Sequence, residues 1–393
     1  MLMLRYRTNT LFLICTSCGV VGSLGLVFAS LFSISSATKA VPERSSHLPA
    51  ELVEMLGRSP VVVEFDRMAI DLPCDREELS RYISLLSAPG PTETASPSRS
   101  RKFHTGRLVA ISGGTPEWIV KRQPNEVNYV KLGSEDYLPT WRGLEAVAMA
   151  NGDRSEHRDQ TLSTLAELDV ALNCRIETRE GSRLVADLLT TSISEFHLDQ
   201  KEISWTASAI ASYLPPQTVW WNRYGEEFSF DTVVQEMMGR KLNRESCRGL
   251  HLVMTLTKIL RIDRKGRILA PEVRESLNTY LHGKLAEAVE AQLEDGAWPM
   301  LWSQSGFSDV FEYTPEGSNV NRVLVTGHML EWFHMLPKDI KPPIKVVQAG
   351  SLWMLNNLRS VPEETVNKHF CPYTHAVLSL YIARFLDNDR HGT

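Results

Sequence analysis

The apolar positions divide the chain into three parts. A run without charged residues extends from about Leu11 to Ile34, and a mixed stretch follows in which short β-branched runs alternate with polar segments. From Thr140 onward, apolar residues recur at three- and four-residue spacing, which is typical of amphipathic helices. The pattern therefore predicts a membrane-length segment, a small irregular α+β segment and a long helical region, with domain boundaries at residues 1–37, 38–139 and 140–393.

The helical region is predicted to contain ten helices in succession. The segment Pro271–Leu293 shows the reasoning: proline suits a first turn, and Val273, Leu277, Leu281 and Leu285 then form one apolar stripe. Gly296 supplies a stop signal soon after. The predicted helices are 141–150, 156–172, 183–196, 204–214, 231–241, 248–260, 271–293, 322–336, 344–358 and 374–386.

Some of these helices have a polar face, whereas others are apolar nearly all round. The second kind includes the runs 250–254, 329–333 and 376–380. A helix that is apolar on all sides is buried on all sides. The alternation predicts an all-α fold in which helical hairpins form an inner and an outer layer.

The segment between residues 38 and 139 has weaker signals. Val61–Phe65 is β-branched and predicts a strand, and Asp75–Leu86 predicts a helix. A Pro/Ser/Thr-rich stretch near 87–101 predicts a mobile loop. Arg107–Ile111 and Trp118–Val120 are expected to form two short strands around a Gly-Gly pair.

The first run has the features of a targeting segment. Arg5 and Arg7 precede it, and it is about as long as the ~20 residues that cross a bilayer. We expect an uncleaved signal anchor, although Ser35–Ala37 leaves cleavage open. The arginines favour a cytoplasmic N-terminus, which puts the remaining chain on the exported, periplasmic or extracytoplasmic side of the membrane.

Charge and cysteine content limit the partners and the cross-links. The formal net charge is -5, so the chain has no electrostatic attraction to nucleic acid. The basic run Arg99–Lys102 is expected to be a solvated linker. Outside the anchor, the sequence has Cys74, Cys174, Cys247 and Cys371, and it leaves both disulfides and buried free thiols open.

One motif makes the fold prediction more specific. Gln292, Gly296 and Trp298 have the form Gln-x-x-x-Gly-x-Trp. This stretch resembles the QW motif of squalene and hopene cyclases, which belong to the α/α-toroid superfamily together with the protein prenyltransferases. The resemblance implies an α/α toroid over residues 140–386, in which the glutamine and the tryptophan tie adjacent hairpins together. The whole chain is similar to membrane-anchored bacterial proteins of this architecture.

The chemistry of that superfamily is not carried over with the motif. Its terpene cyclases protonate their substrates with an Asp-x-Asp-Asp motif, which this sequence lacks. The acidic pair Asp387 and Asp389 lies at the C-terminal end and is expected to be solvated. The zinc ligands of the prenyltransferases have no match at corresponding positions. The resemblance therefore implies a fold and leaves the reaction open.

Three histidines open apolar helices and are candidate metal ligands. They are His251, His328 and His375, and a Cys-x-x-x-His spacing occurs twice, from Cys247 and from Cys371. Imidazole and thiolate suit zinc, which is the one cofactor that the sequence suggests. The alternative is that each histidine caps its helix or binds a neighbouring carbonyl.

Two further sets of residues are candidates for chemistry or binding. His328 and Glu331 share a helix face and suit a catalytic acid–base pair, or else a buried structural hydrogen bond. Candidate ligand-binding residues are aromatic or lie in the aromatic loop 220–227. For that loop, the alternative is that its tryptophans pack on the helices and Arg223 pairs with Glu226 or Glu227. The candidate ligand-binding residues are Trp205, Trp220, Trp221, Arg223 and Trp332.

Two functions follow from these patterns. The first is an exported, membrane-anchored toroid that binds an apolar or glycan-like ligand, or a protein partner, in its central cavity. The alternative is an enzyme of terpene cyclase-like or glycan-active type that uses His328 and Glu331 or a histidine-lined metal site.

Overall fold

A computed structural model describes positions 56 and 157 and residues 59–89, 99–116, 119–123, 126–130, 137–140, 143–146, 159–178, 181–216, 219–303 and 315–386. The chain divides into two compact units, Met1–His47 and Leu48–Thr393, and all described residues belong to the second. The expected anchor and cleavage site lie outside them. Within the described ranges, no helix combines the length and the apolar character that a membrane crossing requires.

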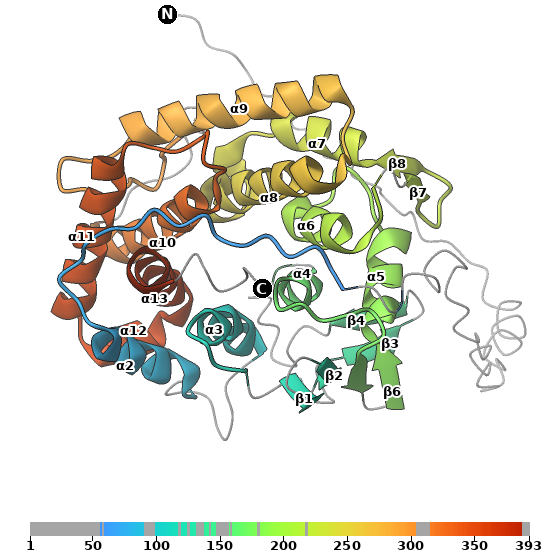
Figure 1. The fold of residues 1–393 in the computed structure, drawn as a ribbon, viewed down its shortest axis with the longest axis horizontal. Helices are drawn as coiled ribbons and strands as arrows, with labels where there is room; N and C mark the ends of the chain where they lie inside the picture. Colours follow the sequence, from blue (N-terminus) through green and yellow to red (C-terminus); the bar gives the residue numbers. More distant parts are fainter. Residues whose placement is uncertain are drawn as a thin grey trace, which may run out of the picture. The chain divides into compact units, whose positions relative to one another are not determined.

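The described part of the chain is mostly helical (Figure 1). Its helices are α2 (Arg76–Ser87), α3 (Arg99–Ile111), α4 (Gln160–Glu167), α5 (Val185–Ser194), α6 (Ile203–Tyr213), α7 (Phe230–Gly239), α8 (Leu250–Gly266), α9 (Pro271–Glu290), α10 (Pro315–Met335), α11 (Ile344–Ser360), α12 (Glu363–Lys368) and α13 (Phe370–Phe385). Two short 3-10 helices, η2 (Leu242–Arg244) and η3 (Ser246–Gly249), precede α8.

The strands are short and form three small sheets. One sheet has the order β1-β2-β5-β6, with β2 and β5 parallel and the other pairs antiparallel, and the other two are the hairpins β3–β4 and β7–β8. Their bounds are β1 (Ile119–Gln123), β2 (Glu126–Val130), β3 (Tyr137–Thr140), β4 (Gly143–Ala146), β5 (Arg175–Thr178), β6 (Gly181–Leu184), β7 (Val219–Trp221) and β8 (Glu227–Ser229).

Helices α3, α4, α6, α8, α10 and α13 contact one another in cyclic order. Each packs against the next, and α13 packs against α3, so that the series of contacts closes on itself (Figure 1). We call these six the inner helices. Helices α2, α5, α7, α9 and α11 pack against inner helices from the other side. The predicted all-round apolar runs lie in α8, α10 and α13, where their side chains are buried as expected.

Helix α9 has the predicted amphipathic character. Pro271 occupies its first turn, and Val273, Leu277, Leu281 and Leu285 are buried. Most of the intervening positions are wholly or partly exposed. The helix therefore packs on its neighbours with one stripe, which is why its limits were readable from the sequence.

The Gln292–Trp298 stretch joins α9 to α11. Gln292 Nε2 donates hydrogen bonds to the carbonyls of Gly296 and Val346, both at 2.8 Å. Trp298 is fully buried and donates from Nε1 to the Ala288 carbonyl at 2.7 Å. Gly350 is required beside it, because a Cβ there would lie 2.6 Å from Cζ3 of Trp298. These contacts bind the end of α9 to the first turns of α11.

Several predictions in the first part of the chain were wrong. Gly143–Ala146 is strand β4, which replaces part of the helix expected at 141–150. Val61–Phe65 has no strand. The strand expected at Arg107–Ile111 and the linker expected at Arg99–Lys102 are both parts of α3, so positions 99–101 of the expected loop are helical too, while positions 90–98 lie outside the described residues.

Helix α3 forms because tertiary contacts outweigh its local sequence preferences. Leu108 is fully buried, and Arg101 is almost fully buried with hydrogen bonds to the Leu86 carbonyl and to Asn367. A segment that contains the β-branched residues Val109 and Ile111 is compatible with a helix when one face is covered, as α13 and α4 cover this one. The four cysteines in the described part of the chain are free thiols.

Candidate functional site

Four histidines of the inner helices and His157, which precedes α4, form one continuous series. The rings of His157 and His251 lie 5.0 Å apart, those of His251 and His328 lie 4.8 Å apart, and those of His328 and His375 lie 3.7 Å apart. His104 of α3 extends the series, with its ring 5.4 Å from that of His375. The three histidines predicted as metal ligands therefore lie together, although they are far apart in the sequence.

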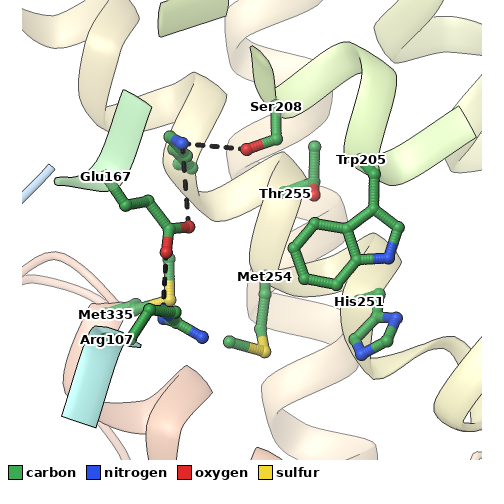
Figure 2. Close-up of a pocket in the computed structure, with 9 residues that line it drawn as sticks. Arg107, Glu167, Trp205, Ser208, His251, Met254, Thr255 and Met335 are labelled. Atoms are coloured by element: carbon green, nitrogen blue, oxygen red, sulfur yellow. Dashed lines mark hydrogen bonds and ion pairs between the residues drawn. The ribbon is translucent and has the colours of Figure 1, made fainter. Parts of the chain in front are cut away.

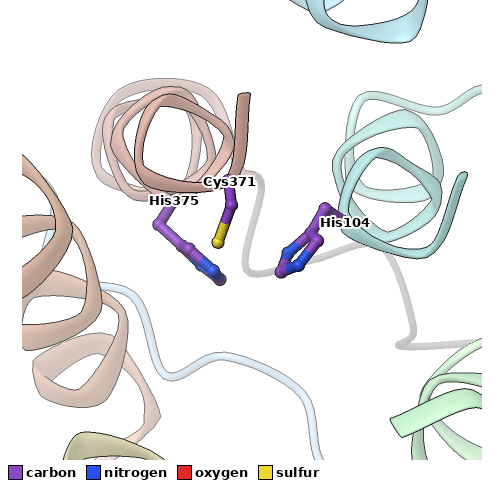
Figure 3. A group of neighbouring side chains, drawn as sticks. All are labelled: His104, Cys371 and His375. Atoms are coloured by element: carbon purple, nitrogen blue, oxygen red, sulfur yellow. The ribbon is translucent and has the colours of Figure 1, made fainter. Parts of the chain in front are cut away.

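At one end of the series, His104, Cys371 and His375 form what we call the α13 group. One potential ligand atom from each residue lies within 4.8 Å of the other two. Figure 3 shows the three side chains directed toward one another, His104 from α3 and the other two from α13. Cys371 and His375 are four residues apart, which places them on the same face of the helix.

Glu331 of α10 contacts the α13 group through His375. Its Oε1 lies 2.7 Å from Nδ1 of His375, and Arg107 Nη1 lies 3.6 Å from its Oε2. Glu331 is fully buried, so this pairing offsets the cost of burying a carboxylate. The hydrogen bond at Nδ1 leaves His375 Nε2 with no hydrogen-bond partner in the described structure.

The charged residues in and beside the α13 group shift one another's pKa values. Burial alone would lower the pKa of His375, but the Glu331 charge, the hydrogen bond with Glu331 and the Cys371 charge outweigh it and raise that pKa to about 9. Burial would likewise raise the pKa of Cys371, but His104 and His375 hold it well below the ordinary thiol value. The group thus favours a thiolate, the form in which cysteine acts as a ligand or a nucleophile.

At the other end of the series, His157, Cys247 and His251 form the α8 group. One potential ligand atom of each again lies within 4.8 Å of the other two. Trp205 of α6 borders the group, with its ring stacked on His157 at 5.9 Å and edge-on to His251 at 4.8 Å. Burial, and then the nearby His157, lower the pKa of His251 well below its ordinary value.

His328 lies between the two groups. It is buried, and neither of its ring nitrogens has a hydrogen-bond partner in the described structure. Its Nδ1 is 3.9 Å from Glu331 Oε2, so the expected pair lies within ion-pair distance, but Glu331 forms its short hydrogen bond with His375. Burial, and then the neighbouring His375, lower the pKa of His328 well below its ordinary value, which favours the neutral ring.

A small cavity of about 30 Å³ lies beside His251 (Figure 2). A volume of this size admits water rather than a large ligand. Three charged residues line one side of it: Glu167 Oε2 is 2.5 Å from Arg107 Nε, and Glu167 Oε1 is 3.8 Å from Lys258 Nζ. Arg107 thus connects this cavity with Glu331 of the α13 group.

Comparison with family models, with curated proteins and with solved structures finds no match for this chain. Function must therefore be inferred from the geometry of the site.

Of the five predicted ligand-binding residues, Trp205 borders the α8 group, and the other four lie outside both groups. Trp220 is buried against Phe196, Phe228 and Phe230, and Trp221 on the same hairpin is 55% exposed. Arg223 pairs with Glu195 at 2.7 Å. Trp332 is fully buried and donates to Thr257 Oγ1 at 2.8 Å. Trp220 is thus packed, as the alternative interpretation of the loop expected, whereas Trp221 is not, and Arg223 pairs with Glu195, where Glu226 or Glu227 was expected.

Sequence reasoning missed His104, His157 and Arg107. Arg107 stood at the start of an expected strand, and His104 lay between that strand and the expected linker, so their i,i+3 spacing on one helix face went unused. His157 precedes α4 without a motif of its own. The repeated Cys-x-x-x-His spacing was the signal that pointed to both groups.

Proposed function

We propose that the protein is a membrane-anchored, exported zinc enzyme in which an α/α toroid surrounds a metal site formed by His104, Cys371 and His375. The reaction class that we propose is hydrolysis of a small polar substrate. The observation that carries the proposal is the convergence of buried histidine and glutamate side chains and a half-buried cysteine from separate inner helices.

The ligand set fits zinc. Tetrahedral zinc with nitrogen bonds of ~2.0–2.1 Å and sulfur bonds of ~2.3 Å separates its ligand atoms by roughly 3.3–3.6 Å. Ligand atoms that already lie within 4.8 Å of one another need only small side-chain rotations to reach that spacing. Three protein ligands leave a fourth position for a substrate or solvent, as in catalytic zinc sites.

The surrounding residues act on these ligands in defined ways. Glu331 fixes the ring orientation of His375 and leaves Nε2 for the metal, which is the usual role of a carboxylate behind a ligating histidine. Arg107 compensates the buried charges of Glu331 and Glu167. Zinc supplies Lewis-acid chemistry when bound, including the activation of water.

The small charged cavity favours this enzyme over a container for an apolar ligand. Its volume of about 30 Å³ suits water and is too small for a large apolar ligand, and the ion-paired Arg107, Glu167 and Lys258 form part of its lining. The toroid part of the proposal is supported by the cyclic contacts of the inner helices and by the hydrogen bond from Gln292 to the Val346 carbonyl. The membrane-anchor part is supported by the N-terminal sequence.

A second candidate function is nucleophilic catalysis by Cys371. Its Sγ lies within 4.8 Å of a ring nitrogen of His375, which in turn is hydrogen-bonded to Glu331 at 2.7 Å. This is the order of nucleophile, base and orienting acid in cysteine hydrolases and acyltransferases. It requires no metal and uses the same three residues.

Metal analysis of the full-length chain separates these candidates. We expect bound zinc in the wild type, less zinc in Cys371→Ser, and no change in His282→Ala, which alters an exposed histidine of α9. A metal-free wild type whose Cys371 is alkylated rapidly at neutral pH would support the thiol nucleophile instead. A zinc content equal in wild type and Cys371→Ser would contradict the proposed site.

A further inference from the structure

We propose that the α8 group, His157, Cys247 and His251, is a second zinc site, so that the inner helices enclose a two-metal centre. The catalytic role of this pair rests on the proposed function, whereas metal binding by the α8 group depends on its own residues alone.

The α8 group repeats the composition of the α13 group. Cys247 precedes His251 by four residues, as Cys371 precedes His375, and each group takes its second histidine from a different part of the chain. The ligand atoms of each group meet the same limit of 4.8 Å. Each group therefore offers two imidazoles and one thiol, a set that zinc favours.

Each group also has a carboxylate behind one histidine. His157 Nδ1 lies 2.6 Å from Glu202 Oε1, just as His375 Nδ1 lies 2.7 Å from Glu331 Oε1. Ser246, next to Cys247, donates a further hydrogen bond to Glu202. A carboxylate on one ring nitrogen fixes the ring and leaves the other nitrogen for a metal.

The backbone at Cys247 adopts a conformation that its sequence does not favour. Cys247 and Arg248 have φ of +49° and +57°, and Gly249 follows at +79°. Non-glycine residues in the left-handed region are disfavoured and persist where the surroundings hold them. Trp302 Nε1 holds this turn with a hydrogen bond to the Arg248 carbonyl at 3.0 Å. The strained turn places Cys247 at the start of α8, next to His251.

A second, independent observation points to a ligand at this site. His251 is only 6% exposed, yet its Nδ1 has no hydrogen-bond partner in the described structure. Both nitrogens of the neighbouring His328 are also without hydrogen bonds. Buried polar atoms are nearly always satisfied, so orphaned nitrogens on adjacent rings indicate that a bound species belongs there. His328 is placed to ligate from between the groups, because its ring contacts both His251 and His375.

Cobalt(II) titration of the full-length chain, after zinc removal by a chelator, tests this proposal. Cobalt gives a thiolate-to-metal absorption band that counts cysteine-ligated ions. We expect two equivalents in the wild type, one in Cys247→Ser, one in Cys371→Ser and none in the double variant. Cys174→Ser is the matched control, because Cys174 is a buried free thiol outside both groups, and it should retain two equivalents.

The outcomes separate the two proposals. One wild-type equivalent that is lost in Cys371→Ser and kept in Cys247→Ser would overturn the second site and leave the proposed function standing. One equivalent that is lost only in Cys247→Ser would do the reverse, and a wild type without cobalt would overturn both. If Cys247→Ser does not fold, Glu202→Gln replaces it, and we expect about 10–100-fold weaker binding of one of the two ions. Equal affinity of both ions in Glu202→Gln would count against the α8 site.

Discussion

We expect His334 of α10 to make the folded protein sensitive to acid. It is fully buried, and its Nδ1 accepts a hydrogen bond from the backbone N–H of Met68 at 3.1 Å. Its own carbonyl accepts from the N–H of Asp66 at 2.7 Å. Burial, and then the nearby charges of Lys341 and Arg67, lower its pKa from 6.5 to about 3. The neutral ring therefore holds residues 66–68 against α10.

The sign and size of the effect follow from linkage. Because the pKa is depressed in the folded state, the unfolded chain binds the proton first as the pH falls. The stabilisation is complete above the unfolded pKa of about 6.5 and is lost progressively down to the folded value of about 3. At pH 5, protonation of the unfolded state alone favours unfolding by a factor of about 30, or about 2 kcal/mol.

Urea denaturation of the full-length chain at pH 7.5 and pH 5.0 measures this effect. In His334→Gln, the amide oxygen can still accept from Met68 but does not titrate. We expect the wild type to lose about 2 kcal/mol more than this variant between the two pH values. His282→Gln, at an exposed position of α9, should behave like the wild type. If the free energy of unfolding falls by the same amount in the wild type and in His334→Gln between pH 7.5 and pH 5.0, the proposal that His334 is buried as a neutral ring is refuted.

Three further substitutions test the packing and the support of the site. Gly350→Ala places a Cβ 2.6 Å from Trp298 and should reduce the free energy of unfolding by about 1–3 kcal/mol, whereas Gly283→Ala, with nothing within 4 Å, should not reduce it. Gln292→Ala removes two hydrogen bonds and should cost about 1–2 kcal/mol in the same urea assay; an unchanged midpoint would mean that the link between α9 and α11 is not stabilising. Glu331→Gln should weaken zinc binding about 10–100-fold in a competition titration with a chromophoric chelator, and unchanged affinity would contradict its role behind the ligating histidine.

The sequence predicted the helices whose packing depends on one clear face. In α9 the buried residues form one stripe, and in α8, α10 and α13 they form continuous apolar runs. Both patterns are visible in the spacing of apolar residues, so these helices could be predicted from the sequence. Helix α3 could not be predicted in this way, because the helices that bury it, α4 and α13, lie far from it in the sequence. Gly143–Ala146 was likewise interpreted as a helix, although its pairing with Tyr137–Thr140 makes it a strand.

The site was predictable only in part, for a related reason. The histidines at 251, 328 and 375 were selected because each was expected near the start of an apolar helix, although α10 begins at Pro315 and His328 lies well inside it. Spacing cannot show which helices are neighbours. The partner of Glu331 illustrates this limit: the sequence suggested His328 three residues away, whereas the short hydrogen bond goes to His375 on α13. Such pairings depend on contacts between helices, which the local sequence pattern does not predict.

Zinc-edge X-ray absorption on the full-length protein tests the metal centre most directly. We predict bound zinc with both nitrogen neighbours at about 2.0–2.1 Å and sulfur neighbours at about 2.3 Å, and a smaller sulfur contribution in Cys371→Ser. A protein purified without zinc, or zinc surrounded by oxygen and nitrogen alone, would contradict the proposal that Cys371 and its neighbouring histidines bind the metal.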